Sequence, residues 1–497
     1  MKRVVIIGSG IAGIAASIRL RHMGFEVWVY EANSYPGGKM DSLELGDYRF
    51  DMGPSLFTMP HLVEELFELF SINTSDHFAY SRKDTICNYF WEDGSRFTAH
   101  ADINKFIEEA CNVFQVEAKT LQTYLNNNQK KYELTSELFL EKSLHKVSTY
   151  LNRKALKAIL SLGVLDIGSS LDKINKSTFK DEKLIQLFNR YATYNGSSPY
   201  RTPGIMSMIP HLEMKLGTFF PKGGMKAIPL SLYHLAASQG VKFHFNENVV
   251  SILQSGGKVL GIETENGQVE ADVVVSNADI FSSYSTLLDK GDASMRVMKE
   301  ERSSSALIFY WGIKKKFKEL DLHNIFFSQD YQSEFEHIFN KKSVHKDPTV
   351  YVNISSKCEP SDAPHYGENW FVMINTPGNF GQDWDKMIPE IRNNVIQKLS
   401  RILNEDILNL IEEEHVLDPR TIESKTRSHR GSLYGTSSNS RFAAFLRHPN
   451  YSSKLKNLYF CGGSVHPGGG IPLCLFSAKI VSEFIGIKHA DYYSNTG

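Results

Sequence analysis

The chain has 497 residues, of which 41% are hydrophobic and 22% charged, and this composition indicates a multidomain globular protein rather than a disordered or fibrous one. The formal net charge of −1 excludes the strongly basic field that is typical of nucleic-acid binding, so we expect no nucleic-acid partner. The five cysteines show no CxxC spacing, so we expect a reducing compartment, with neither a disulfide framework nor a metal site.

The chain begins with a predicted strand, turn, helix and strand over residues 3–31. "RVVIIG" is rich in β-branched residues, "SGIAGIAASIRLRHMG" carries small and apolar residues at helical spacing, and "FEVWVYE" is again β-branched and aromatic. Gly24 is placed to end the helix. The basic start and the uncharged run also resemble a signal peptide, but the glycine spacing explains the segment better.

Between the first strand and the helix lies the motif Gly8-x-Gly10-x-x-Gly13. Gly8 permits a tight turn, Gly10 lets the backbone approach a pyrophosphate, and Gly13 allows the helix to pack closely on the strand. Glu31 ends the second strand, where a carboxylate can accept hydrogen bonds from a ribose. The pattern predicts a dinucleotide without a 2′-phosphate, and it leaves FAD and NAD open.

The segment "ANSYPGGKM" follows directly and contains Gly37, Gly38 and Lys39. A glycine pair and a cation at this distance would approach the second phosphate or the flavin end of an extended dinucleotide. Alone, the segment would be a Pro-Gly turn with a solvated lysine.

Hydrophobic periodicity predicts the other elements along the chain. We expect helices over residues 60–71, 100–165 and 471–488, and strands within residues 240–276, 306–313 and 348–376. Pro472 would lie in the first turn of the last helix, where its missing N–H does no harm.

Two middle segments are candidates for handling an apolar substrate. Residues 151–167 have a basic start and an apolar run, which suits a helix at a membrane surface and equally a core helix with a lysine-rich outer face. Residues 188–210 are rich in Phe and Tyr and could line a tunnel, although aromatic clusters more often form a core.

Three glycines occur in a row in "VHPGGGIPLCLFSAK", residues 465–479. Glycine is costly to order, so such a run indicates positive φ values or a ligand lying close to the backbone.

Several long motifs carry a family resemblance over nearly the whole chain. The region from Gly13 to Lys39 and "FDMGPS" resemble flavoproteins such as amine oxidases and carotenoid desaturases. "GTFFPKGGM", "HNIFFSQDY", "DPTVYVNISSKCEPSDAP" and "NLYFCGGSVHPGGGIP" resemble the bacterial-type phytoene desaturase family. "SLYGTSSNS", "AAFLRHPN" and "CGGSVHPGGGIPLCLFSAKI" are most similar to its 1-hydroxycarotenoid 3,4-desaturase branch, with Leu473 and Cys474 replacing the small residues more usual in phytoene desaturases.

The resemblance implies a mixed α/β fold, with a Rossmann-like FAD-binding domain of the glutathione-reductase and amine-oxidase type. This domain would be interleaved with a β-sheet substrate domain and a helical, membrane-facing subdomain at about 100–200. We assign residues 1–75, 216–290 and 416–497 to the FAD-binding domain, and residues 76–215 and 291–415 to the substrate domain.

The resemblance also implies FAD as the cofactor. The expected cofactor-binding residues are Gly8, Gly10, Ile11, Ala12, Gly13, Glu31, Ala32, Gly37, Gly38, Lys39, Gly53, Pro54, Ser55, Val249, Gly462, Gly463, Gly469, Gly470 and Ile471.

The implied reaction removes a hydride and a proton from neighbouring carbons of a C40 polyene. Flavin takes the hydride, and the remaining charge is delocalised, so no strong protein base is required and no catalytic residue is assigned. His466 and Glu213 are candidates by position, but a structural or channel-lining role fits each of them better. The helix that begins near residue 471 would point its N-terminus at the flavin, where its dipole stabilises negative charge.

The implied partners are a carotenoid, the membrane surface, and oxygen or a quinone as electron acceptor, with a peripheral location on the cytoplasmic side of the membrane. Desaturation of phytoene itself, or a reaction like that of retinol saturases, is the alternative within the family. A flavin amine oxidase is disfavoured because Gly463 stands where such enzymes usually carry an acidic residue. A flavin-binding lipid carrier related to Rab escort proteins is the non-enzymatic alternative.

Overall fold

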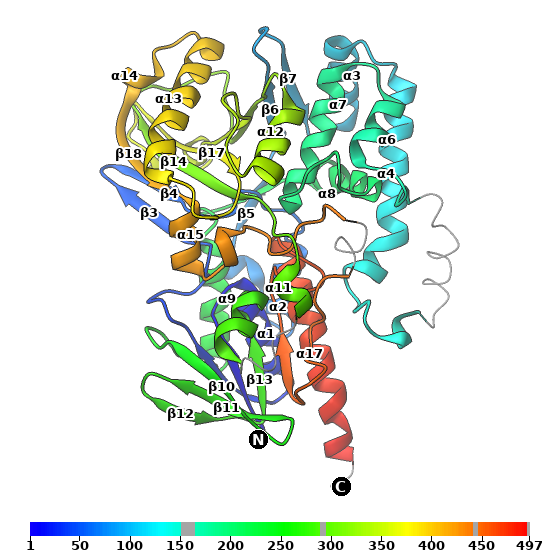
Figure 1. The fold of residues 1–497 in the computed structure, drawn as a ribbon, viewed down its shortest axis with the longest axis vertical. Helices are drawn as coiled ribbons and strands as arrows, with labels where there is room; N and C mark the ends of the chain where they lie inside the picture. Colours follow the sequence, from blue (N-terminus) through cyan, green and yellow to red (C-terminus); the bar gives the residue numbers. More distant parts are fainter. Residues whose placement is uncertain (151–164, 289–294, 441–445, 495–497) are drawn as a thin grey trace.

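A computed structural model describes residues 1–150, 165–288, 295–440 and 446–494. Its first sheet is parallel, with the strand order β19-β13-β1-β2-β9. These strands are β1 (Arg3–Ile7), β2 (Glu26–Tyr30), β9 (Lys242–His244), β13 (Val273–Ser276) and β19 (Leu458–Phe460). They come from the beginning, middle and end of the chain, which lie together in the lower half of Figure 1.

Both faces of the inner strands of the parallel sheet are covered, so β1 and β13 are apolar along almost their whole length. Val4 and Ile6 of β1 face a core that is shared with α1 (Ile11–His22), α9 (Ala227–Ser238) and α17 (Ile471–Ser494). Val5 and Ile7 face the opposite core, which is shared with β10 (Val249–Ser255) and β11 (Lys258–Thr264) of a three-stranded sheet completed by β12 (Gly267–Glu270). This alternation places the turn after β1 at the edge of the sheet, between two filled layers.

The second sheet has seven strands in the order β18-β14-β17-β16-β15-β6-β7. They are β6 (Thr85–Phe90), β7 (Arg96–His100), β14 (Ser305–Ile313), β15 (His323–Phe326), β16 (Val350–Asn353), β17 (Glu368–Thr376) and β18 (Ile411–Leu417). Only the pairing of β15 with β6 is parallel among these strands of the described chain. One face packs against α13 (Trp384–Leu403), and the other packs against helices and against the first part of the chain.

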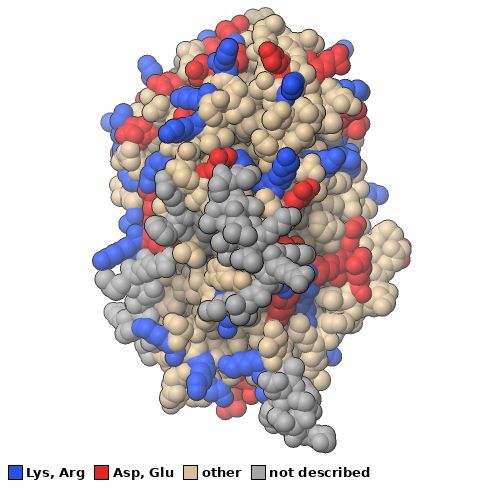
Figure 2. Space-filling model, turned by 90° about the vertical axis from the view of Figure 1, so that its right-hand side faces the viewer, with Lys and Arg blue, Asp and Glu red and all other residues tan. Residues whose placement is uncertain are grey.

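Helices beside β6 and β7 form a separate subdomain at the upper right of Figure 1. They are α3 (Ile103–Phe114), α4 (Ala118–Phe139), α6 (Leu171–Thr178), α7 (Glu182–Asn189) and α8 (Ile209–Met214). On the face that Figure 2 shows, basic and acidic side chains are interspersed over the drawn surface. Within the described ranges, no helix combines the length and the apolar character needed to cross a bilayer.

The remaining elements are short and connect these layers. They include β3 (Ser42–Leu45), β4 (Tyr48–Asp51), α2 (His61–Glu68), β5 (Tyr80–Arg82), β8 (Phe219–Pro221), α10 (Ile280–Ser282), α11 (Met295–Lys299), α12 (Tyr331–Glu336), α14 (Ile407–Leu410) and α15 (Pro419–Thr426). The hairpin of β3 with β4 packs on the second sheet, and β5 pairs with β8.

The structure confirms the mixed α/β class and the strand–helix–strand start, while two of the predicted spans were too long. The helical prediction over residues 100–165 is divided by Gln115, whose φ of 52° ends α3. Residues 151–164 lie outside the described residues, so the candidate interfacial helix stays a prediction. In the strand prediction over residues 348–376, prolines and two short 3-10 turns separate β16 from β17. The domain boundaries likewise stay predictions.

Candidate functional site

The predicted cofactor residues lie where the parallel strands end. Gly8 follows β1, Glu31 follows β2, and Gly462 comes soon after β19. Asn277 follows β13, which pairs with β1 on the side opposite β2. The order of the strands therefore reverses at β1, and the carboxyl edge at such a switch point is where open α/β sheets bind ligands.

The first glycine loop has the geometry that its spacing predicts. Gly8 has a φ of 94°, and a Cβ atom built on Gly13 would lie 2.2 Å from the Gly8 carbonyl oxygen. A Cβ atom on Gly10 would lie 2.7 Å from Oδ1 of Asn277. Gly10 is the N-cap of α1 and supplies no side-chain hydrogen bond, so the first N–H groups of this helix, which include those of Ile11 and Ala12, are available to an anion.

Glu31 is buried below this loop and holds it in place. Its Oε2 accepts hydrogen bonds from the backbone N–H of Ser9 (2.8 Å) and from Ser9 Oγ (2.9 Å), and its Oε1 accepts from the backbone and side chain of Asn33 (2.9 Å each). The N–H of Glu247 donates to the Glu31 carbonyl oxygen at 2.9 Å, and this contact brings the start of β10, with the buried Val249, to the same edge. Ala32 is exposed beside Glu31. The predicted ribose carboxylate is thus also a support for the phosphate loop.

The second loop packs on the first, and the third loop packs on the second. The N–H of Gly37 donates to the Ser9 carbonyl oxygen at 2.8 Å, and a Cβ atom on Gly38 would lie 3.2 Å from the Gly10 Cα. A Cβ atom on Gly53 would lie 1.9 Å from the Lys39 carbonyl oxygen, and Pro54 and Ser55 continue from there. Glycines were therefore necessary for these three loops to approach one another.

Lys39 connects its loop to a segment far along the chain. Its ammonium donates to the backbone carbonyl oxygens of Ser432 (3.1 Å) and Leu433 (3.0 Å), so it joins the early loop to the late part of the chain. Burial lowers its pKa to about 8, and the nearby Asp279 opposes that shift. The expected contact with a phosphate stays a prediction.

The C-terminal glycine run forms a compact turn at the start of α17. A Cβ atom on Gly463 would lie 3.1 Å from the Gly469 Cα, and one on Gly469 would lie 2.9 Å from Tyr434. Gly470 has a φ of 111° and is followed by the buried Ile471, the first residue of α17. The three glycines therefore permit close packing and positive φ values where the helix begins.

Cys474 lies one turn into α17, and its N–H donates to the Gly470 carbonyl oxygen at 2.9 Å. Burial raises the pKa of its thiol to about 11, while the charge of Lys39 acts in the opposite direction. Cys474, one of the two residues that the sequence analysis associates with the 3,4-desaturase branch, is therefore a neutral thiol within electrostatic reach of the early loops.

Sequence reasoning missed Asn277, which joins the first and last glycine loops. Its Nδ2 donates to the Cys461 carbonyl oxygen at 3.1 Å, its backbone N–H donates to the Ile7 carbonyl oxygen at 2.8 Å, and it limits the space beside Gly10, Gly13 and Gly462. Its position directly after the apolar strand "DVVVS" was the available signal.

Sequence reasoning also missed two buried arginines. Arg302 forms an ion pair with Asp279, and its Nε and Nη1 have no partner within the described part of the chain. Arg447 donates to the Tyr434 carbonyl oxygen at 3.0 Å, and burial, with repulsion from Arg302, lowers its pKa to about 10. Buried cations in excess of buried carboxylates require an anion. These residues therefore fit a dinucleotide with a pyrophosphate.

Neither candidate base is positioned to act as one. The Nε2 of His466 donates to the Lys142 carbonyl oxygen at 2.8 Å, and burial lowers the pKa of this histidine to about 4. Both carboxylate oxygens of Glu213 accept hydrogen bonds of 3.0 Å from Arg190. Both residues are thus engaged in structural interactions, in line with the structural role that the sequence analysis favoured for them.

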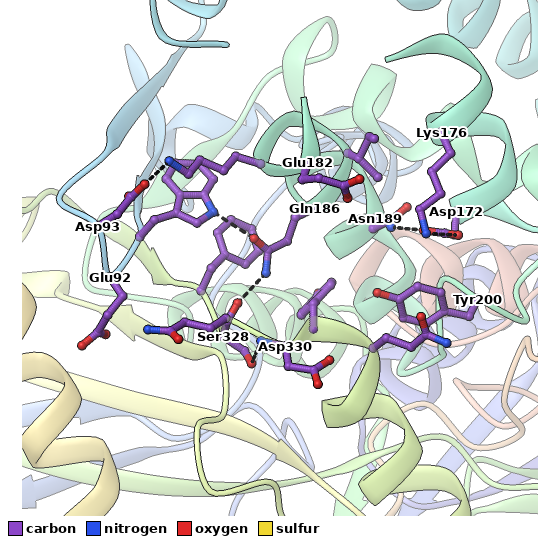
Figure 3. A pocket seen from close by; sticks show the side chains of 17 residues that line it. Glu92, Asp93, Asp172, Lys176, Glu182, Gln186, Asn189, Tyr200, Ser328 and Asp330 are labelled. Atoms are coloured by element: carbon purple, nitrogen blue, oxygen red, sulfur yellow. Dashed lines mark hydrogen bonds and ion pairs between the residues drawn. The ribbon is translucent and has the colours of Figure 1, made fainter. Parts of the chain in front are cut away.

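A polar pocket of about 420 Å³ is lined by side chains of α6, α7 and residues 327–332 and is shown in Figure 3. Gln186 crosses it, accepting a hydrogen bond from Trp91 Nε1 and donating to the Ser328 carbonyl oxygen (2.8 Å each). Asp93, Asp172 and other acidic residues line it. None of the predicted cofactor residues lines this pocket, so it is separate from the cofactor site.

Residues 11–485 match the model of the flavin-containing amine oxidoreductase family. The chain belongs to this family. The membership confirms the expectations of an FAD cofactor and of an oxidoreductase.

Within the family the chain is 56% identical to a 1-hydroxycarotenoid 3,4-desaturase from a Flavobacterium species, over 98% of this chain and 99% of that protein. It is 30% identical to the phytoene desaturase of Fusarium fujikuroi, over 99% and 90% of the two chains. An oxidoreductase from Methanosarcina mazei shares the fold with a TM-score of 0.64 at 16% identity, over 97% of this chain and 100% of that one. A putrescine oxidase bound to putrescine shares it with a TM-score of 0.63 at 13% identity, over 99% of each chain.

Proposed function

We propose that the protein is an FAD-dependent carotenoid desaturase that introduces a 3,4 double bond at an acyclic, 1-hydroxylated end of a carotenoid. The observation that carries this proposal is the 56% identity to a 1-hydroxycarotenoid 3,4-desaturase along 98% of the chain. The 30% identity to a phytoene desaturase makes desaturation of phytoene the second candidate.

The chain supplies the binding and the electrostatics, and the bound FAD supplies the hydride acceptor. The N-terminus of α1 and the three glycine loops would hold the pyrophosphate, and Glu31 would orient the ribose end. Arg302 and Lys39 place positive charge at the junction of the loops. The N-terminus of α17 presents its partial positive charge at the same junction, where it favours negative charge on a ligand.

The rest of the proposal concerns where the protein works and what reoxidises it. A C40 polyene is confined to membranes, so we infer that the protein acts as a peripheral protein on the cytoplasmic side of the membrane. Residues 151–167 are the proposed contact, and oxygen or a quinone is the proposed electron acceptor. Membrane flotation of the wild-type protein, and of a variant in which Arg153, Lys154 and Lys157 are replaced by glutamate, tests the contact.

Anaerobic incubation of the FAD-loaded protein with carotenoid-containing liposomes tests the activity. Three liposome preparations would carry a 1-hydroxylated acyclic carotenoid, phytoene, or no carotenoid. Bleaching of the flavin band with a red shift of the polyene in the first preparation alone supports the proposal. Reaction with phytoene alone would assign the second candidate, and bleaching by neither substrate would refute a carotenoid desaturase.

A further inference from the structure

A buried group of charged and hydroxyl side chains lies between the seven-stranded sheet and the helical segments of residues 182–214. Arg190 follows α7, is only 6% exposed, and donates from Nη2 to both carboxylate oxygens of Glu213 at 3.0 Å. Its Nε donates to the Tyr89 hydroxyl at 2.8 Å, and its guanidinium lies 4.3 Å from the ring centre of Tyr191. Burying an ion pair rarely stabilises a core more than apolar residues would, so this arrangement needs another explanation.

The sheet places a histidine beside this group. His323 of β15 pairs with Asn353 of β16, and its neighbour Asn324 pairs with Asn88 of β6. Side chains alternate between the faces of a strand, so His323 shares a face with Tyr89 and with Tyr351. Burial, with the positive charge of Arg190 as the next cause, lowers the pKa of His323 to about 3, so the imidazole is neutral.

Hydrogen bonds engage one of the two nitrogens of His323. The Nδ2 of Asn353 donates to the Leu322 carbonyl oxygen at 3.0 Å, which orients the amide, and the same Nδ2 lies 3.2 Å from His323 Nδ1. The Nδ1 atom is therefore the engaged nitrogen of the ring. Nε2 is buried and has no partner among the described residues.

A second buried polar atom of the group is also unpartnered. The hydroxyl of Tyr191 has no hydrogen-bond partner in the part of the chain that the structure describes, and the side chain is completely buried. Burial raises the pKa of Tyr191 well above its usual value, so the group remains a phenol that can both donate and accept. Each buried, unpaired polar group costs about 1–3 kcal/mol unless a ligand or water satisfies it.

The group is connected to the cofactor loops by two hydrogen bonds. Ser55, two residues after the Gly53 that packs on Lys39, lies 2.8 Å from the Tyr351 hydroxyl. That hydroxyl lies 2.7 Å from His323 Nδ1. The Tyr351 hydroxyl thus links Ser55 to the imidazole ring of His323. A substrate atom held by His323 Nε2 would therefore be close to the loops that we assign to FAD.

We propose that His323 and Tyr191, which lie beside the Arg190–Glu213 ion pair, bind the hydroxyl group at the end of the carotenoid substrate. The alcohol forms a hydrogen bond with His323 Nε2, and a second hydrogen bond joins the alcohol to the Tyr191 phenol. The carbon that bears the hydroxyl, C1, is separated from C3 by a single carbon, so anchoring the hydroxyl positions the bond to be oxidised. This inference rests on the proposed function and names the residues that select its substrate.

The test uses the FAD-loaded protein and two carotenoids in liposomes that differ only in the terminal hydroxyl. Tyr191→Phe removes one oxygen and keeps the ring, and His323→Asn keeps a polar acceptor near the position of Nδ1 while removing Nε2. Losing one hydrogen bond to the substrate is expected to lower kcat/KM for the hydroxylated carotenoid about tenfold in each variant. The value for the carotenoid that lacks the hydroxyl should not change.

Tyr124→Phe is the matched control, because the Tyr124 hydroxyl donates to Asn175 Oδ1 at 2.7 Å within the same aromatic core. It should leave the ratio of the two kcat/KM values unchanged. FAD content and the thermal midpoint report whether each variant is folded, and Tyr191→Phe, which breaks no hydrogen bond of the described structure, should remain folded.

Three outcomes overturn the inference. An unchanged ratio in both Tyr191→Phe and His323→Asn would show that the unpartnered atoms bind water and do not recognise the substrate. Equal oxidation of both carotenoids by the wild-type protein would refute hydroxyl recognition and leave the desaturase activity standing. Oxidation of neither carotenoid by FAD-loaded wild-type protein would refute the proposed function and the inference with it.

Discussion

The buried ion pair between Arg190 and Glu213 allows a quantitative prediction about stability. The side chains are only 7% and 2% exposed, and the pair is joined by two hydrogen bonds of 3.0 Å. Arg190→Met would leave the Glu213 carboxylate buried without a cation, which costs about 3–5 kcal/mol in comparable pairs. Adding Glu213→Leu removes that uncompensated charge, so we expect the double variant to recover most of the lost stability.

Urea unfolding of FAD-loaded protein, followed by tryptophan fluorescence, measures these differences as shifts in the transition midpoint. The exposed pair of Arg201 with Glu301 is a matched control, because its distance is also 3.0 Å but its side chains are 42% and 37% exposed. Arg201→Met should cost less than about 1 kcal/mol. A loss below about 1 kcal/mol for Arg190→Met, or a double variant as unstable as the single one, would refute the reasoning.

Three further outcomes follow from the site. Gly10→Val should yield protein without the flavin absorbance band, because the valine side chain would meet Asn277 and occupy the space expected for the pyrophosphate. A yellow, flavin-containing variant would contradict the placement of the pyrophosphate at Gly10. Lys39→Met removes a charged donor at the junction of the loops, so it should raise the dissociation constant for FAD about tenfold or more. Titration of flavin fluorescence measures this constant. An unchanged constant would show that Lys39 is a purely structural residue. Burial holds the pKa of His466 at about 4, below the value near 6.5 in an unfolded chain, so its contribution to stability is complete above about pH 6.5 and is lost as pH falls toward 4. His466→Gln should therefore show a smaller loss of thermal midpoint between those pH values than the wild-type protein, and parallel curves would refute this role.

The sequence was sufficient to predict the cofactor loops, because glycine positions and strand ends are local signals. Gly8, Gly10 and Gly13 lie where the spacing placed them, and the run from Gly468 to Gly470 precedes a helix as expected. The carbonyl partners of Lys39 could not be predicted, because Ser432 and Leu433 lie almost 400 residues further along the chain.

The functional residues that could not be predicted from the sequence were missed for one physical reason. Arg302 follows a run of charged residues and Arg447 precedes His448 and Pro449, and only the folded chain shows that both arginines are buried close to one another. His323 and Tyr191 were visible only as members of a strand and of an aromatic segment, and their unpartnered atoms are a property of packing. Local patterns predict which backbone segments approach a ligand, whereas the charges that surround it depend on tertiary contacts.

The stability and specificity predictions together separate a structural role of the buried group from a functional one. A core that served folding alone would gain from apolar replacements, because an ion pair and two unpartnered polar atoms are all unfavourable in a dry interior. The variant that combines Arg190→Met with Glu213→Leu is therefore expected to fold with nearly normal stability. If the group recognises the substrate, the same variant should lose the preference for a hydroxylated carotenoid, because Tyr191 loses the guanidinium that packs on its ring. A stable variant that keeps this preference would show that the ion pair has neither role, and the selection of substrate would then have to come from the shape of the apolar surface.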